Sequence, residues 1–168
     1  MQPSRMTRFW SKLILCVLVV MVLGASGGFV TVKSIPGWYA SLTKPPGTPP
    51  NTVFGPVWSV LYLMIGVSLA RVWHFVPGGT EKRRALIRFA IQLVLNLAWS
   101  PVFFGAHLIA PALVVIVTLW VMILLTILAF KPLDRTAAWL LAPYLGWVSY
   151  ATYLNTGFLV VNAATGNP

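Results

Sequence analysis

Long uncharged segments, separated by short basic ones, dominate the pattern of hydrophobic and polar positions along the chain. Residues 13–32 contain no charge over twenty positions, and residues 53–70 contain none over eighteen. A helix that crosses a membrane needs about 20 mostly apolar residues. Residues 89–130 are uncharged over 42 positions but are interrupted at 105–111 by a turn-like stretch, and no charge follows Arg135. This pattern indicates five membrane-spanning segments.

We therefore predict an all-α fold, an integral membrane bundle of five transmembrane helices in one domain covering residues 1–168. The helices are expected near residues 9–32, 53–75, 84–105, 109–130 and 137–161. A signal peptide is the alternative for the first segment, because Arg5, Arg8 and Lys12 precede it and residues 25–27 resemble a cleavage site. The apolar stretch continues to Val32, beyond the roughly 7–15 residues of a signal-peptide core, so we expect a retained helix.

The composition supports a membrane protein. Hydrophobic residues make up 58% of the chain and charged residues only 8%, whereas soluble domains carry about 25% charged residues. So few charges cannot solvate the surface of a water-soluble domain of this size. The single cysteine, Cys16, lies inside an apolar run, so no internal disulfide is expected.

The basic residues predict the orientation in the membrane. Lys33 and Lys44 alone fall on the face that holds the first and third connections. By the positive-inside rule the N-terminus is cytoplasmic and the C-terminus is outside. A bacterial inner membrane fits best, although the sequence leaves an outer membrane open. No nucleic-acid partner is expected, because the basic residues flank membrane spans. The other face holds ten of the twelve basic residues: Arg5, Arg8, Lys12, Arg71, Lys82, Arg83, Arg84, Arg88, Lys131 and Arg135.

The first connection, residues 33–52, is unusual for its prolines. Pro45, Pro46, Pro49 and Pro50 fix the backbone and remove four N–H donors, which predicts an extended, semi-rigid segment. We interpret it as an outer lid over the mouth of the bundle, kept ordered without hydrogen-bonded structure. The alternative is an ordinary interfacial loop, with Trp38 and Tyr39 in the aromatic belt at the membrane surface.

Three of the predicted helices carry aromatic and hydrogen-bonding residues along one face. In the third helix Gln92, Asn96 and Ser100 recur every four residues. Polar side chains at this depth usually face the interior of a bundle. Together these faces indicate a cavity for a large, flat, mostly apolar ligand, although a bundle packed by aromatic residues explains the spacing equally well. The remaining members are Trp58 and Tyr62, Trp99, and in the last helix Tyr144, Trp147 or Val148, Ala151 and Asn155.

Three motifs in these segments resemble the TspO/translocator protein family, the tryptophan-rich sensory proteins and peripheral-type benzodiazepine receptors. They read "WY..L.KP...PP..VFGPVW..LY", "Q..LN..WSPVFFG" and "PYLGW..YAT.LN", in that order over residues 38–155. The resemblance implies a five-helix membrane receptor or sensor, often a homodimer, that binds protoporphyrin and haem, and sterols in eukaryotic members. It also implies binding of isoquinoline carboxamide-type synthetic ligands. The implied roles are tetrapyrrole transport, regulation or light-dependent breakdown.

The resemblance also implies which residues contact the ligand. We expect the Trp58 indole N–H and Asn96 to meet a ligand carbonyl. Independently of the resemblance, Lys33 and Lys44 are the only charges on this face, so they either meet porphyrin carboxylates at the mouth or only mark the membrane boundary. The tyrosine-and-basic motif proposed for cholesterol has no counterpart in the last helix, because nothing basic follows Arg135. The implied ligand-binding residues are Tyr39, Pro49, Trp58, Tyr62, Asn96, Trp99, Trp147 and Ala151.

An enzyme and a transporter are the two alternatives to a receptor. An enzyme with acid–base residues is disfavoured because the only acidic residues, Glu81 and Asp134, fall in connections. His74 and His107 are expected near opposite membrane faces, so no metal site and no obligatory cofactor are predicted. A tryptophan-dependent breakdown of porphyrin would need no acid–base residue and stays open.

A small transporter of tetrapyrroles or sterols is the other alternative, although the sequence offers no intramembrane charge and no internal repeat. Small residues at 24 and 28 and at 66 and 70 allow close helix contacts. Those contacts fit either a homodimer or packing within one chain.

Overall fold

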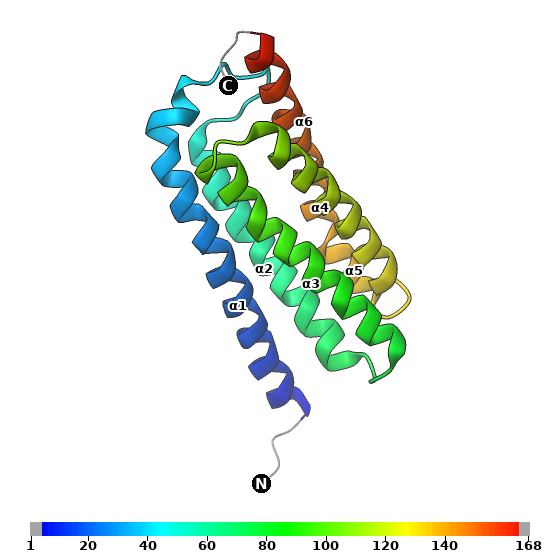
Figure 1. Ribbon diagram of the computed structural model, residues 1–168. Helices are drawn as coiled ribbons and strands as arrows, with labels where there is room; N and C mark the ends of the chain where they lie inside the picture. The colour runs from blue at the N-terminus through cyan, green and yellow to red at the C-terminus, as the bar shows by residue number, and fades with distance from the viewer. Residues whose placement is uncertain (1–4, 165–168) are drawn as a thin grey trace.

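The computed structural model describes residues 5–164, which form an all-α bundle of five rods. The first three rods are α1 (Arg5–Ser34) with η1 (Ile35–Tyr39), α2 (Asn51–Phe75), and α3 (Thr80–Ser100) with η2 (Pro101–Gly105). The fourth is α4 (Ile109–Phe130), and the fifth consists of α5 (Arg135–Leu140) and α6 (Ala142–Ala164). Successive rods run up and down beside one another (Figure 1). The predicted five-helix fold is confirmed.

Four of the rods are long and apolar enough to cross a membrane: Met6–Tyr39, Asn51–Phe75, Thr80–Gly105 and Ile109–Phe130. In the fifth rod, α6 has 23 residues, which corresponds to about 35 Å of helix, but its tyrosines, asparagines and threonines lower its mean hydropathy. The protein is therefore a multi-pass membrane protein.

The first rod extends further than the sequence predicted. We expected the helix to end at Val32, but helical structure continues through Ser41, with a kink at Gly37 (φ −106°, ψ −105°). Pro36 precedes the kink and has no backbone N–H to donate, which weakens the helix there. The irregular connection consequently covers only residues 42–50 instead of 33–52.

This shorter connection contains one tight turn. The Thr48 N–H donates to the Pro45 carbonyl oxygen over 3.3 Å, and Gly47 between them has a φ of 83°. Proline at the second position and glycine at the third are what a type II turn requires. The chain then enters α2 directly at Asn51.

The last rod is broken where a single helix was expected over residues 137–161. The α5 helix ends at Leu140, and α6 starts at Ala142. Pro143 lies just inside α6 and has no N–H for the carbonyl of Trp139 one turn earlier, which explains the break. At its start, α5 is capped by Asp134, whose carboxylate accepts the Ala137 N–H at 2.9 Å.

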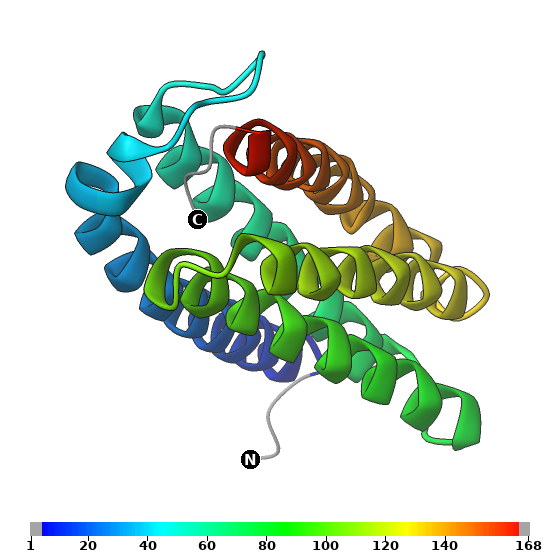
Figure 2. The same ribbon diagram turned by 45° about the horizontal axis from the view of Figure 1, so that its top comes forward.

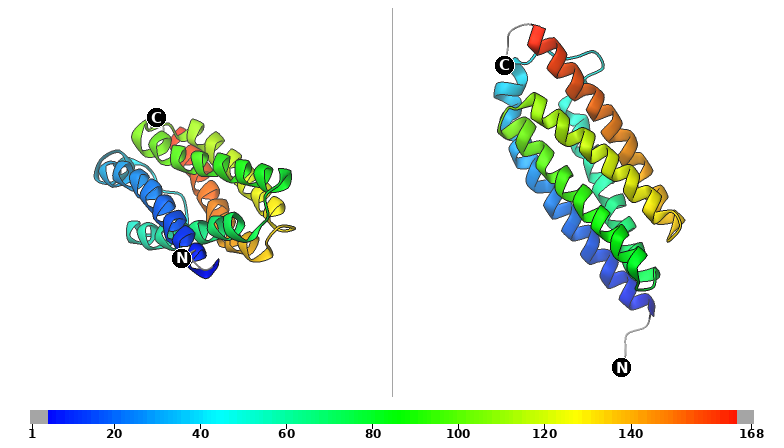
Figure 3. Two further views of the ribbon diagram at one scale, coloured as in Figure 1. Left: turned by 90° about the horizontal axis from the view of Figure 1, so that it is seen from below. Right: turned by 45° about the vertical axis from the view of Figure 1, so that its right-hand side comes forward.

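The α1 helix lies at the edge of the bundle, where it packs on α2 and α3 (Figure 3). Glycines allow this contact: a Cβ at Gly66 would lie 2.7 Å from the Cα of Val17, and one at Gly24 would collide with the ring of Tyr62. Both glycines therefore serve packing within one chain, which was the alternative to a dimer contact. The core lies mainly among α2 to α6, where Phe89 and Phe130 stack at 6.0 Å, and α1 contributes Val20 to it.

Candidate ligand-binding site

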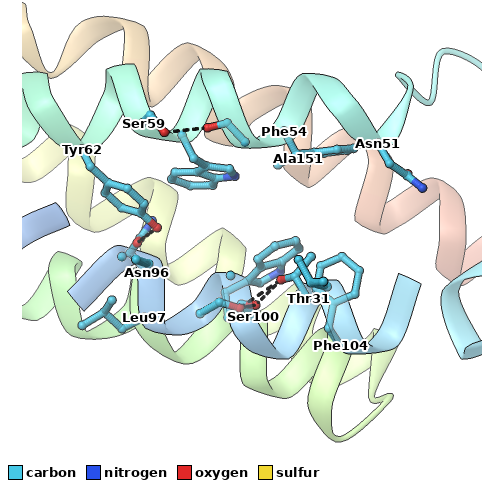
Figure 4. Close-up of a pocket in the computed structure, with 18 of the residues that line it drawn as sticks. Thr31, Asn51, Phe54, Ser59, Tyr62, Asn96, Leu97, Ser100, Phe104 and Ala151 are labelled. Atoms are coloured by element: carbon cyan, nitrogen blue, oxygen red, sulfur yellow. Dashed lines mark hydrogen bonds between the residues drawn. The ribbon is translucent and has the colours of Figure 1, made fainter. Parts of the chain in front are cut away.

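A cavity of 530 Å³ lies between α1, α2, α3 and α6, in the half of the bundle that carries the connection 42–50 (Figure 4). Most of its surface is aromatic, aliphatic or glycine. Among the residues that the structure describes, none of those lining the cavity is charged. They are Met21, Gly24, Ala25, Gly27, Gly28, Thr31, Val32, Ile35, Tyr39, Asn51, Thr52, Phe54, Gly55, Trp58, Ser59, Tyr62, Asn96, Leu97, Trp99, Ser100, Phe104, Trp147 and Ala151.

The cavity exists because α1 and α2 diverge. The two helices touch where Gly66 meets Val17, and again where Gly24 meets the ring of Tyr62. Beyond that level, a Cβ at Gly28 on α1 or at Gly55 on α2 would meet no atom within 4 Å. The wedge between the separated helices is the space that the cavity occupies.

Tyr62 and Asn96 form the floor of the cavity. The Tyr62 hydroxyl donates to Oδ1 of Asn96 at 3.2 Å, joining α2 to α3 (Figure 4). The ring of Trp58, one turn earlier in α2, stacks on Tyr62 with centroids 5.2 Å apart. Asn96 is buried and Trp58 half-buried. The floor is thus a hydrogen-bonded platform with an indole ring lying on it.

The three tryptophans that line the cavity differ in their hydrogen bonding. The Trp99 indole N–H donates to Oδ1 of Asn155 at 3.1 Å, and Nδ2 of Asn155 donates to the Ile109 carbonyl at 3.0 Å. Trp99 is therefore fixed and its donor is used. Within residues 5–164, the indole N–H groups of Trp58 and Trp147 have no hydrogen-bond partner. Two aromatic donors consequently remain available at the cavity.

A polar cross-link closes the wall between α1 and α3. The Thr31 and Ser100 hydroxyls are 2.8 Å apart, and they lie 3.1 and 2.9 Å from the Gly27 carbonyl oxygen (Figure 4). Each hydroxyl has one proton, so one of them donates to the other while the second donates to Gly27. These hydroxyls satisfy each other and the backbone, so they hold the wall in place rather than reach into the cavity.

The structure brings together seven of the eight residues predicted for the site, and Pro49 is the exception. The open choice in the last helix is resolved, because Trp147 lines the cavity while Val148 is packed in the core. Gln92, Tyr144 and Asn155 from the predicted polar faces are buried behind the cavity wall.

The residues of α1 that line the cavity were not anticipated. Gly24, Ala25, Gly27 and Gly28 form a run of small residues, and Thr31 follows one turn later. Such residues give no aromatic or polar periodicity, and their contribution is the space they leave. The small residues at 24 and 28 were noted in the sequence as a site of close helix contact, and this is the one signal that could have indicated the cavity wall.

The middle of the connection 42–50 packs on α6 (Figure 2). The Tyr153 hydroxyl donates to the Pro46 carbonyl at 3.1 Å, and the Tyr150 hydroxyl donates to that of Gly47. Asn162 pairs with the backbone of Thr43 in both directions, each bond being 3.0 Å long. The connection is thus ordered by side chains of α6, and residues flanking it, Tyr39 and Asn51, reach the cavity.

The two histidines lie at opposite ends of the bundle, as expected. His74 is in the last turn of α2, against Phe9 and Phe75, and His107 follows η2, stacked on Trp38 with centroids 4.4 Å apart. In the described part of the chain, neither lines the cavity.

Fold and site together define a class: a multi-pass helical membrane protein with an uncharged, aromatic-walled cavity between its helices. The chain belongs to the TspO/MBR family, whose sequence model matches residues 16–161. It is 43% identical over 150 residues to the tryptophan-rich protein TspO of Chlorobaculum tepidum, covering 89% of this chain and 95% of that one.

Other relatives carry names that refer to sensing or translocation. The tryptophan-rich sensory protein of Cereibacter sphaeroides is 40% identical over 118 residues, covering 70% of this chain and 72% of that one. The translocator protein of Homo sapiens is also 40% identical, over 136 residues, covering 77% of this chain and 79% of that one.

Proposed function

We propose that this protein is a membrane receptor or sensor that binds porphyrins, protoporphyrin and haem among them, in the cavity between α1, α2, α3 and α6. The observation that carries the proposal is the combination of aromatic walls with the unused indole donors of Trp58 and Trp147 in a space of 530 Å³. Pockets for small molecules span roughly 300–1,000 Å³ and pair apolar walls with a few polar groups. The protein's role would lie in tetrapyrrole transport, regulation or breakdown.

The absence of charge among the described residues that line the cavity suggests how a porphyrin would be oriented. The macrocycle would lie inside, stacked on indole rings, with its carboxylates at the mouth. Lys44 supports this orientation, because its Nζ lies 5.4 Å from the ring centroid of Tyr39, which lines the cavity. Lys33, in the last turn of α1, is the other cation of this end.

A neutral ligand would use the same donors differently. An isoquinoline carboxamide carries a carbonyl that accepts a hydrogen bond, and Trp58 offers an indole N–H beside the floor. Asn96 accepts from Tyr62 through Oδ1, so its amide N–H₂ group is the second donor we assign to this ligand.

The proposal is tested by titrating the purified protein with protoporphyrin and following tryptophan fluorescence. We expect Trp58→Phe and Trp147→Phe each to weaken binding by about 1–2 kcal/mol, roughly five- to thirtyfold, because each change removes a hydrogen bond and part of a stacking surface. Trp120→Phe is the matched control. Trp120 lies on α4 outside the cavity, and its indole N–H donates to Ser149 at 2.7 Å.

Unchanged affinity in both cavity variants would mean that these aromatic residues only pack the bundle. An equal loss in the Trp120→Phe control would point to a general effect on the fold. Circular dichroism of each variant separates loss of the site from loss of structure.

A further inference from the structure

A second hollow lies at the other end of the bundle, where α2 ends and α3 begins. In Figure 1 this turn is at the lower end, near the first turns of α1. The hollow has a volume of 480 Å³ and is open on one side of the bundle. It is lined by Trp73, Gly78, Gly79, Lys82, Arg83, Leu86, Ile87 and Ala90.

Two cations, Lys82 and Arg83, line this hollow, and a third, Lys12, lies over the ring of Trp73 at its edge. Nζ of Lys82 donates to the carbonyl oxygens of Trp73 and Val76, at 2.8 Å each. An ammonium has three N–H donors, so one proton of Lys82 remains. Nζ of Lys12 lies 4.8 Å from the centroid of the Trp73 ring, and Arg83 lines the hollow itself.

No acidic side chain in residues 5–164 compensates these cations. The sequence has two acidic residues, and both are engaged elsewhere. Glu81 pairs with Arg84 at 3.2 Å, and Asp134 pairs with Arg71 at 3.1 Å. The hollow therefore carries a concentrated positive charge suited to an anion.

The other half of the hollow is apolar. On α3, Leu86 and Ala90 follow Lys82 at intervals of one turn, so they share its face. From residue 82 to residue 90 the helix rises about 12 Å. Ile87 is 49% exposed and Trp73 is 38% exposed, and Ala90 is exposed too, whereas Leu86 is half-buried against the core. The apolar half of the hollow is therefore open to the surroundings and has Leu86 at its base. Charge at one end and an apolar channel at the other fit an amphiphile.

We propose that this hollow binds an anionic phospholipid. Its phosphate would contact Arg83, Lys12 and the remaining proton of Lys82, and an acyl chain would run along Leu86 and Ala90. A membrane lipid fits better than free phosphate, because free phosphate would leave the apolar half of the hollow uncovered. The site uses none of the residues that line the ligand cavity, so it stands independently of the proposed function.

The test is lipid binding to the purified, delipidated protein in a neutral detergent, measured by native mass spectrometry with phosphatidylglycerol and phosphatidylcholine as probes. We expect phosphatidylglycerol to be retained in preference. Each basic residue near a membrane surface strengthens binding of an anionic lipid by roughly fivefold. The double variant Lys12→Gln, Arg83→Gln should therefore lose roughly twenty-five-fold in affinity for phosphatidylglycerol. Lys82 is kept because it caps α2.

The matched control is Arg88→Gln with Lys131→Gln, which removes the same charge from residues outside the hollow. This control should keep the preference for phosphatidylglycerol. A second variant, Ile87→Gln, tests the apolar half and should weaken both lipids. Equal losses in the two charge variants would overturn the proposal, because the preference would then follow net charge alone. Displacement of phosphatidylglycerol by millimolar inorganic phosphate would overturn it in favour of a simple anion site.

Discussion

The contact between Gly24 and Tyr62 offers a sensitive test of how the cavity floor is built. A Cβ at residue 24 would collide with the Tyr62 ring, so Gly24→Ala forces that ring aside. Overpacking of this kind costs about 1–3 kcal/mol. A displaced Tyr62 also loses its 3.2 Å hydrogen bond to Asn96, worth about 1 kcal/mol. The higher helix propensity of alanine stabilises the folded state by about 1 kcal/mol relative to glycine. The net decrease in the free energy of unfolding is therefore about 1–3 kcal/mol.

The chain provides its own reporter for this measurement. Cys16 is the single cysteine and is 4% exposed, so a thiol-reactive dye labels it when the bundle opens on heating. For a protein of this size 1 kcal/mol shifts Tm by about 2–4 °C, which predicts a decrease of about 2–12 °C for Gly24→Ala. Protoporphyrin binding should weaken by about fivefold, because Trp58 stacks on the displaced ring.

Gly28→Ala is the control for this prediction. It makes the same chemical change one turn further along α1, at a position where a Cβ meets nothing within 4 Å. Its Tm should stay level or rise. If both alanines shifted Tm equally, or if Gly24→Ala left ligand affinity untouched, the assignment of Tyr62 as the floor would be refuted.

Three further predictions concern other parts of the molecule. Asp134→Ala removes both a partner of Arg71 and the cap of α5, and should lower stability by about 2–4 kcal/mol in the thiol assay. Glu81→Gln breaks only an exposed pair and should cost less than about 1 kcal/mol; equal effects would contradict the structure. Haem and protoporphyrin should bind within about threefold of each other in fluorescence titrations, because no histidine or cysteine of residues 5–164 lines the cavity and the Tyr62 hydroxyl is engaged with Asn96; tenfold tighter haem binding would mean iron ligation, with Met21 and Tyr39 as the lining residues able to supply it. A reporter fused after the last residue should read non-cytoplasmic and one between α2 and α3 cytoplasmic; finding both on one side would refute an odd number of spans between them.

The number and approximate bounds of the helices could be predicted from the sequence, because membrane-spanning helices are marked by long apolar segments between charged residues. The fourth helix was predicted at residues 109–130, and the structure has Ile109–Phe130. Errors arose where backbone chemistry decides the outcome. Helical structure beyond Val32 and the break at Leu141 depend on how Pro36 and Pro143 are accommodated, which hydropathy does not register.

The cavity was predictable only on the helices with aromatic and amide side chains. Residue type and spacing were enough to predict Trp58, Asn96 and Trp147 as cavity residues, and all three line the cavity in the structure. The wall contributed by α1 is made of small residues such as Gly28, and a missing side chain leaves no periodic signal. Whether Pro49 faced a ligand depended on where the connection packs, which is a long-range property that local pattern does not contain.

The way the connection 42–50 is held has a consequence for biosynthesis. Its side-chain partners, Tyr150, Tyr153 and Asn162, lie 103, 107 and 119 positions later in the chain than the residues they bind. A chain made from its N-terminus therefore exposes this segment long before α6 exists to receive it. The mouth of the cavity therefore cannot acquire its final form before α6 has been made, and a nascent chain that stops before α6 would have four rods and no finished site.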